Sequence, residues 1–137
     1  MSGYYRKYYE DEEMNLTEKQ LSTLAKIKTV APLVGIDPAW AAAVAMVESS
    51  LGTNQLSPTG CKGVFQMSMI AMKDLYQMMQ ATDDDFADIA CGMVFLHLLL
   101  KRWKTIEEAT AHFCDPNDRG FYVDKVKGYM IALGGIL

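Results

Sequence analysis

The hydrophobic positions of the chain recur mostly at helical spacing. Thr17 and Gln20 stand three residues apart, as in a capping box, and apolar residues then follow at intervals of three and four. Pro32 strains the last turn of this stretch, and Gly35 suits its end. We therefore predict a first helix that begins after Thr17 and ends at Gly35.

A second helix is predicted directly afterwards. Asp37 suits the N-cap, and Pro38 suits the first helical position. The stretch AWAAAVAMV that follows is apolar on every side, which is typical of a buried helix. We expect this helix to end near Gly52.

The middle of the chain contains two further helical patterns. Ser68 can cap a methionine-rich helix, one face of which is formed by Met72, Leu75, Tyr76 and Met79. Three acids at 83–85 precede a long apolar stretch, residues 86–103, and suit the positive end of a helix dipole. We expect this long helix to be central to the fold.

The C-terminal part predicts two more helices. Thr105 and Glu108 form a capping box for a short helix to about Phe113, and a last helix runs from Phe121 to Gly134. Strand signals are weak, although residues 59–66 suit a short extended turn. The predicted fold class is all-α, with about six helices around the second and the fourth.

The chain length and the apolar fraction fit one compact domain. The 137 residues are half apolar, which is enough for a single core. The net charge of -4 and a pI near 5.1, without a basic cluster, argue against nucleic acid as a partner. No apolar run is long enough to cross a bilayer, so we expect no membrane span. We divide the chain into residues 1–15, a flexible or partner-docking arm rich in tyrosine and charge, and a domain of residues 16–137.

The cysteines favour neither a disulfide framework nor a metal site. Cys61, Cys91 and Cys114 are odd in number, widely spaced and without a Cys-x-x-Cys motif, which favours free thiols. A zinc site that combines them with His97 or His112 has poor ligand spacing. We expect no metal and no cofactor.

Glu48 is the first candidate for chemistry. It follows Trp40 and Val44 at successive steps of four, which places its carboxyl in line with two large apolar side chains. Burial and the negative end of the helix dipole both favour the protonated form. These features suit a general acid, although an ordinary glutamate at a helix end has the same position.

The loop after Glu48 has the composition of a ligand-binding turn. Gly60 and Gly63 allow tight turns and a close approach of the backbone to a ligand. Ser57, Gln66 and Ser68 offer neutral hydrogen-bonding groups that suit sugar hydroxyls and acetamides. A surface turn punctuated by glycine is the alternative.

Three blocks of the sequence resemble the soluble lytic transglycosylase family, which is related to goose-type lysozyme. The first, the catalytic motif, comprises Glu48, Ser49, Ser57, Gly60, Cys61 in the alanine position, Gly63, Val64, Phe65 and Gln66. The second comprises Asp88 in place of asparagine, Ile89, Gly92, Phe95 in place of tyrosine, and Leu96. The third comprises Tyr122, Val123 and Val126. Their common order makes the resemblance more specific than any one block.

The resemblance implies a lysozyme-like all-α domain with a catalytic loop after the second helix. It implies that Glu48 is the catalytic acid and that the sugar groove is lined by Ser57, Gln66, Met67 and Tyr122. The chain departs from the family's Ala-Tyr-Asn-Ala-Gly motif, in whose place stand residues 111–115. We expect His112 to take the position of the tyrosine; a half-buried packing role is the alternative.

The resemblance also implies a mechanism with one carboxyl group. Family members cleave the β-1,4 bond between N-acetylmuramic acid and N-acetylglucosamine in peptidoglycan, and the C6 hydroxyl of the substrate attacks C1 to give a 1,6-anhydro product. Glu48 would serve first as acid and then as base. Hydrolysis, as in a muramidase, needs a second carboxylate, for which Asp115 and Asp118 are the candidates.

Two other classes of function stay open. A lysozyme-like module that binds glycan or a partner without turnover would fit the altered motif at residues 111–115. A methionine-rich helical adaptor would explain the ten methionines but not the motif around Glu48.

The destination of the protein follows from the expected substrate. The N-terminus lacks the apolar segment of a signal peptide, so we expect synthesis in the cytoplasm and action at the periplasm or cell wall. A bacteriophage particle, a holin or a specialised secretion machine would provide the route. Residues 1–15 are the candidate docking segment for the particle or the machine.

Overall fold

The computed structural model describes residues 14–55, 63–66, 85–113, 117 and 119–137. These residues form five helices and no strand, so the described part of the chain is all-α, as predicted. The methionine-rich helix predicted after Ser68 lies outside the described residues. So does the predicted arm up to residue 13, whereas Met14 packs against the core.

The first described helix, α2, spans Glu18–Val34. The Thr17 hydroxyl accepts a hydrogen bond from the backbone N–H of Gln20 (3.1 Å), and the Gln20 side chain accepts one from the backbone N–H of Thr17 (3.0 Å). Gly35 follows with φ 82°, a left-handed conformation that glycine adopts without strain. Both predicted ends of this helix are confirmed.

The second helix, α3, spans Pro38–Ser49. Asp37 caps it by accepting a hydrogen bond from the backbone N–H of Ala39 (2.9 Å), and every residue from 40 to 46 is buried, as predicted. It ends before the predicted Gly52 because three successive residues, Ser50, Leu51 and Gly52, have φ of 49°, 55° and 85°. The side chain of Leu51 is fully buried, which offsets the strain of its left-handed backbone.

The remaining helices are α5, α6 and α7, which span Asp85–Trp103, Ile106–Ala111 and Arg119–Gly134. Thr105 caps α6 by accepting a hydrogen bond from the backbone N–H of Glu108 (3.2 Å), as predicted. Helix α6 ends earlier than the predicted Phe113, and α7 begins earlier than the predicted Phe121. None of the described helices has the length and apolar character of a bilayer span.

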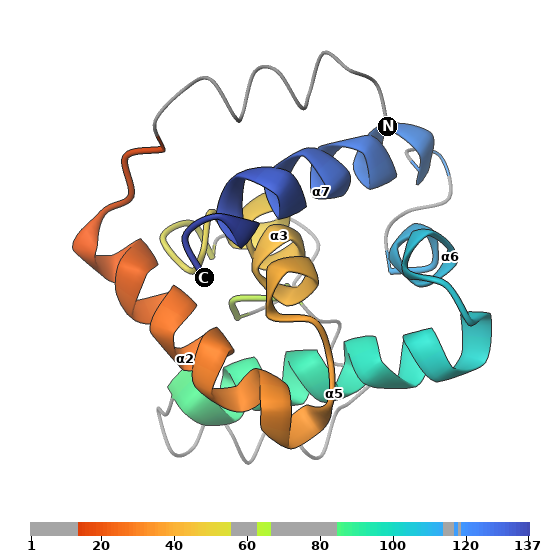
Figure 1. Ribbon diagram of the computed structural model, residues 1–137, viewed down its shortest axis with the longest axis horizontal. Helices are drawn as coiled ribbons and strands as arrows, with labels where there is room; N and C mark the ends of the chain where they lie inside the picture. Colours follow the sequence, from red (N-terminus) through yellow and green to blue (C-terminus); the bar gives the residue numbers. More distant parts are fainter. Residues whose placement is uncertain (1–13, 56–62, 67–84, 114–116, 118) are drawn as a thin grey trace.

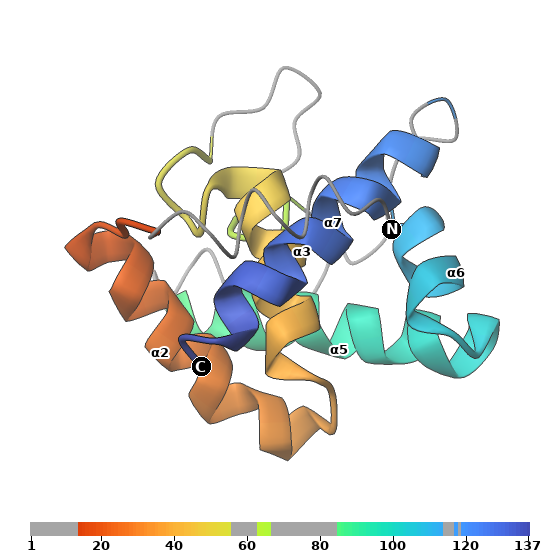
Figure 2. The same ribbon diagram turned by 45° about the horizontal axis from the view of Figure 1, so that its top comes forward.

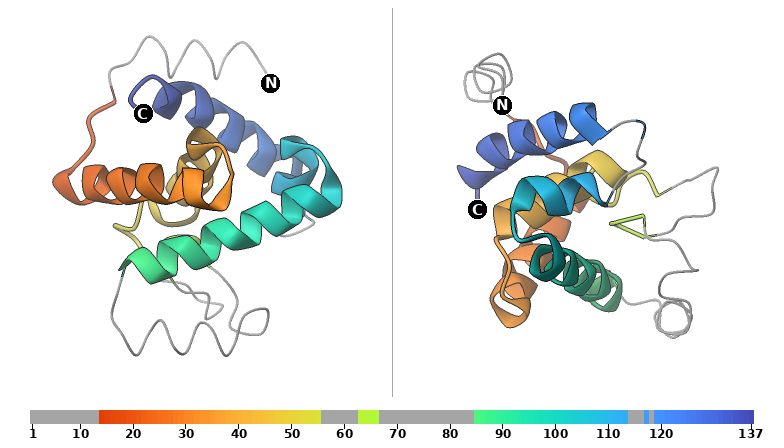
Figure 3. Two further views of the ribbon diagram at one scale, coloured as in Figure 1. Left: turned by 60° about the horizontal axis from the view of Figure 1, so that its bottom comes forward. Right: turned by 90° about the vertical axis from the view of Figure 1, so that its right-hand side faces the viewer.

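Helix α3 lies in the middle of the other four (Figure 1). It packs against α2 and α7, while α2 contacts α5, α5 contacts α6, and α6 contacts α7. Figures 2 and 3 show the same arrangement from other directions. The sequence also predicts a central position for α5; this helix has an exposed face with Val94 and Leu98, whereas residues 40–46 of α3 are buried on every side.

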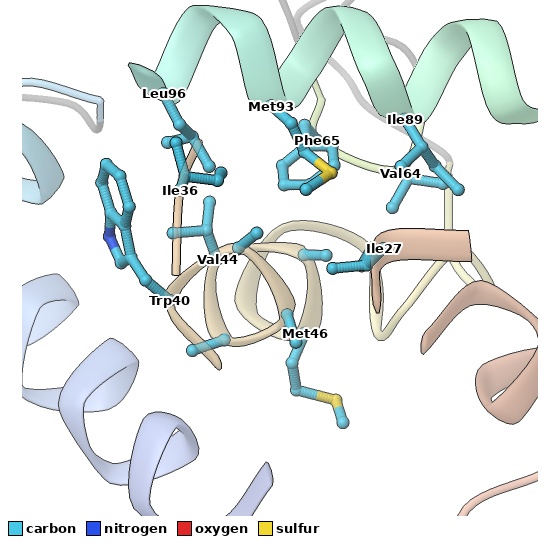
Figure 4. Packing of buried hydrophobic residues seen from close by; sticks show 14 of the residues in the cluster. Ile27, Ile36, Trp40, Val44, Met46, Val64, Phe65, Ile89, Met93 and Leu96 are labelled. Carbon is cyan, nitrogen blue, oxygen red and sulfur yellow. The ribbon is translucent and has the colours of Figure 1, made fainter. Parts of the chain in front are cut away.

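Two residues of the loop after α3 belong to the core. Val64 and Phe65 lie beside Ile89 and Met93 of α5, between that helix and α3 (Figure 4). A Cβ at Gly92 of α5 would collide with the Phe65 ring, so glycine is required there for the ring to pack. Residues 63–66 are thereby fixed against the helix that carries the second sequence block.

Candidate active site

Glu48 lies in the last turn of α3 and is half-buried. Trp40 and Val44, two turns and one turn earlier on the same helix, are fully buried. Glu48 therefore follows two buried apolar side chains, as its spacing from them predicts. Burial is the largest effect on Glu48 and raises the pKa of its carboxyl above the ordinary 4.5. The group therefore retains its proton at a higher pH than an exposed glutamate does.

Tyr122 connects Glu48 to another helix. It lies in the first turn of α7, and its hydroxyl donates a hydrogen bond of 2.5 Å to Oε2 of Glu48. The tyrosine side chain is 8% exposed, so the bond is shielded from water. Donation to the carboxylate lowers the pKa of Glu48, and so does the positive charge of Lys125, against the larger effect of burial. Burial on one side, and Tyr122 and Lys125 on the other, thus shift the pKa of Glu48 in opposite directions.

Ser49, next to Glu48, fastens the loop to the end of α3. Its buried hydroxyl donates to the backbone carbonyl of Val64 (2.5 Å) and accepts from the backbone N–H of Gly52 (2.9 Å). The backbone N–H of Val64 donates to Oδ2 of Asp88 on α5 (3.0 Å). Both backbone groups of buried Val64 are thus satisfied by side chains from two helices, which holds the loop in place.

Gly63 and Gln66 shape the turn within this loop. Gly63 has φ 83°, and a Cβ there would collide with the Asp88 carboxyl. Glycine at position 63 therefore allows the backbone to lie close to Asp88 of α5; the approach of a ligand predicted from the sequence stays a prediction. The Gln66 side-chain amide donates to the backbone carbonyls of Gly63 (2.8 Å) and Gln55 (3.2 Å). Gln66 thus joins the turn at residues 63–66 to Gln55.

His112 has a packing role in the structure. Its ring stacks on Trp103, with centroids 3.6 Å apart and planes inclined by 10°. Its Nδ1 lies 2.8 Å from the backbone carbonyl oxygen of Glu108, which accepts the hydrogen bond. Among the described site residues, Tyr122 contacts Glu48, whereas Gln66 and His112 engage the loop and the end of α5. The half-buried packing role, the alternative drawn from the sequence, matches these contacts.

Several predicted residues lie outside the described part of the chain. These are Ser57 and Met67 from the catalytic motif, and Asp115 and Asp118, the candidates for a second carboxylate. Within the described residues, no group of three histidine, cysteine or acidic side chains could hold a metal ion.

The sequence did not assign roles to three residues near the site. Lys125 acts on Glu48 by its charge, and Ser49 and Asp88 hold the loop. The position of Lys125, one turn after Tyr122 on the last helix, is the signal that could have identified it.

Comparisons with known proteins give no relative for this chain. No protein-family model, curated protein or solved structure matches it. We therefore infer a function from the residues around Glu48 and their geometry.

Proposed function

We propose that the protein is a peptidoglycan lytic transglycosylase that cleaves the β-1,4 bond between N-acetylmuramic acid and N-acetylglucosamine. The observation that supports this function best is the hydrogen bond from Tyr122 to half-buried Glu48. Burial favours the protonated acid, while Tyr122 and Lys125 favour the carboxylate. Such a balance suits one residue that must first give a proton and then take one.

Glu48 acts first as the acid. With Oε2 accepting the hydrogen bond from Tyr122, the acidic proton resides on Oε1. It passes to the glycosidic oxygen as the bond between this oxygen and C1 of N-acetylmuramic acid breaks, so that N-acetylglucosamine leaves as a neutral alcohol. The 2-acetamido group of the substrate stabilises the positive charge at C1.

Glu48 then acts as the base. Its carboxylate, stabilised by the hydroxyl of Tyr122 and the charge of Lys125, removes the proton of the C6 hydroxyl while O6 bonds to C1. The product is a 1,6-anhydro sugar, and Glu48 regains its proton. No second carboxylate is needed, which distinguishes this reaction from those of ordinary retaining and inverting glycosidases.

The fold and the destination belong to the same proposal. The all-α domain is of the lysozyme-like type, and the enzyme reaches the cell wall as a component of a bacteriophage particle or through a holin or specialised secretion machine. Residues 1–15 dock it to the particle or machine. Its substrate is the glycan strand of bacterial peptidoglycan.

The proposal is tested by digestion of purified peptidoglycan with the wild type, Glu48→Gln and Glu18→Gln, followed by mass analysis of the fragments. Glu18 is an exposed glutamate at the start of α2 and serves as the matched control. We expect fragments lighter by one water than hydrolytic muropeptides from the wild type and Glu18→Gln, and none from Glu48→Gln.

Other outcomes point to the alternatives. Fragments of hydrolytic mass that depend on Glu48 would indicate a muramidase. Tight glycan binding without any product would indicate a binding module. Equal activity of wild type and Glu48→Gln would exclude Glu48 as the catalytic acid.

A further inference from the structure

Phe121 and Lys125 form a pair beside the residue that contacts Glu48. They lie four residues apart on α7, and Nζ of Lys125 is 5.3 Å from the centroid of the Phe121 ring. Side chains at this spacing share one side of a helix, and Tyr122 lies on the adjoining side. The Phe121 ring is 63% exposed, so an apolar surface and a cation adjoin the hydrogen bond between Tyr122 and Glu48.

The charge of Lys125 is not neutralised by an ion pair with any described residue. Lys127, two residues later, forms an ion pair with Glu107 at 3.6 Å, whereas Lys125 has no such partner in the described part of the chain. Lys125 is nevertheless close enough to lower the pKa of Glu48. Half-buried and held over an aromatic ring, it is a positive charge near the reacting carboxyl.

We propose that Lys125, held by Phe121, binds a carboxylate of the substrate next to the bond that Glu48 protonates. This inference rests on the proposed function and deepens it. N-acetylmuramic acid carries a lactyl group that ends in a carboxylate or continues into a peptide with carboxylates of its own, whereas N-acetylglucosamine carries neither. Lys125 therefore gives the site a preference for muramyl glycan over neutral chitin.

The physical basis of the preference is charge complementarity near a partly buried site. A lysine ammonium is a compact point charge that pairs with a carboxylate without strict geometry. Its attraction is weakened by salt, as for any ion pair near a protein surface. The exposed ring of Phe121 offers the lactyl methyl group or a sugar face an apolar surface, which adds affinity without charge.

The test measures ligand affinities in the Glu48→Gln protein, which is expected not to cleave the ligands and lacks the charge of Glu48. The ligands are a peptide-bearing glycan fragment, the same fragment after amidase removal of the peptide, which leaves the lactyl carboxylate, and a neutral chito-oligosaccharide. We compare this parent protein with three variants that add Lys125→Ala, Lys125→Arg or Lys127→Ala. Lys127→Ala is the matched control on the same helix.

We expect the protein with Lys125 to prefer the carboxylated ligands over the chito-oligosaccharide. Lys125→Ala reduces this preference about fivefold, as for an ion pair near the protein surface, while Lys125→Arg and Lys127→Ala retain it. If Lys125→Ala lowers the affinity only for the peptide-bearing fragment, Lys125 binds a carboxylate of the peptide. If it lowers the affinity for both carboxylated ligands, Lys125 also binds the lactyl carboxylate.

Two results would overturn the inference and are distinct from failure of the proposed function. One is equal affinity for all three ligands in the presence of Lys125. The other is an unchanged preference in Lys125→Ala, whether its affinities stay the same or fall equally for all ligands. If the parent protein binds none of the ligands, the proposed function fails and this inference fails with it.

Discussion

Tyr122 and Glu48 are 74 residues apart in the sequence and are joined by a hydrogen bond of 2.5 Å that connects the first turn of α7 to the last turn of α3. The bond opposes the effect of burial on the same carboxyl, because it stabilises the charged form that burial disfavours. Both effects can be measured separately by substitution.

Tyr122→Phe removes the hydroxyl and is expected to raise the pKa of Glu48 further. The acid then stays protonated to higher pH, so the basic limb of the pH profile of kcat/KM moves upward. The maximal rate falls about tenfold, because a hydrogen bond to a charged group worth about 1.5 kcal/mol no longer orients and stabilises the carboxylate. Tyr129→Phe on the same helix is the control, and a basic limb that stays in place would contradict the role of Tyr122.

Glu48→Gln is expected to unfold less readily than the wild type at neutral pH. Since the pKa of Glu48 is raised on folding, the stability that depends on its proton is fully present below the ordinary pKa of 4.5 and is lost as the pH rises through the folded-state pKa. Glutamine does not ionise, so the advantage of the variant is absent in acid and appears toward neutral pH. Urea unfolding at both pH values measures it, and equal stability at neutral pH would contradict the raised pKa.

Ser49→Ala is expected to destabilise the fold by about 1–3 kcal/mol, because the buried backbone groups of Val64 and Gly52 lose their partner. The loop is then less well held, so activity falls as well. Ser22→Ala, on the exposed side of α2, is the control and changes the free energy of unfolding by less than about 0.5 kcal/mol. Similar effects of both substitutions, measured by urea unfolding, would count against the anchoring role of Ser49.

Two glycine substitutions in helices are expected to have opposite effects. Gly92→Ala places a methyl group against the Phe65 ring and destabilises the protein by about 1–3 kcal/mol through overpacking. Gly120→Ala meets open space in α7 and stabilises it by up to about 1 kcal/mol through helix propensity. Thermal unfolding compares the two, and a neutral Gly92→Ala would mean that Phe65 does not pack against α5.

The starts of α2, α3 and α6 could be predicted from the sequence because their causes are local. The hydrogen bonds of Thr17 with Gln20, Asp37 with Ala39 and Thr105 with Glu108 join residues within three positions of one another. The all-apolar stretch after Pro38 likewise indicates burial without reference to any other part of the chain.

Other features depend on which helices meet, and the sequence pattern does not contain this information. The end of α3 was misplaced because the left-handed turn depends on Leu51 entering the core. Which face of α5 is exposed could not be predicted either, because the exposure of Val94 and Leu98 depends on how the other helices pack. The sequence places Phe65 in the catalytic motif without indicating that its ring packs against Gly92 of α5. The effect of Lys125 on Glu48 likewise requires α7 to lie against α3.

The most direct test of the central claim, that Glu48 alone serves as acid and base, is digestion of peptidoglycan in water enriched in heavy oxygen. Attack by the C6 hydroxyl of the substrate predicts 1,6-anhydro fragments that carry none of the label, formed by the wild type and absent with Glu48→Gln. Fragments that carry one labelled oxygen at the new end would show that water attacks C1, and would contradict the account.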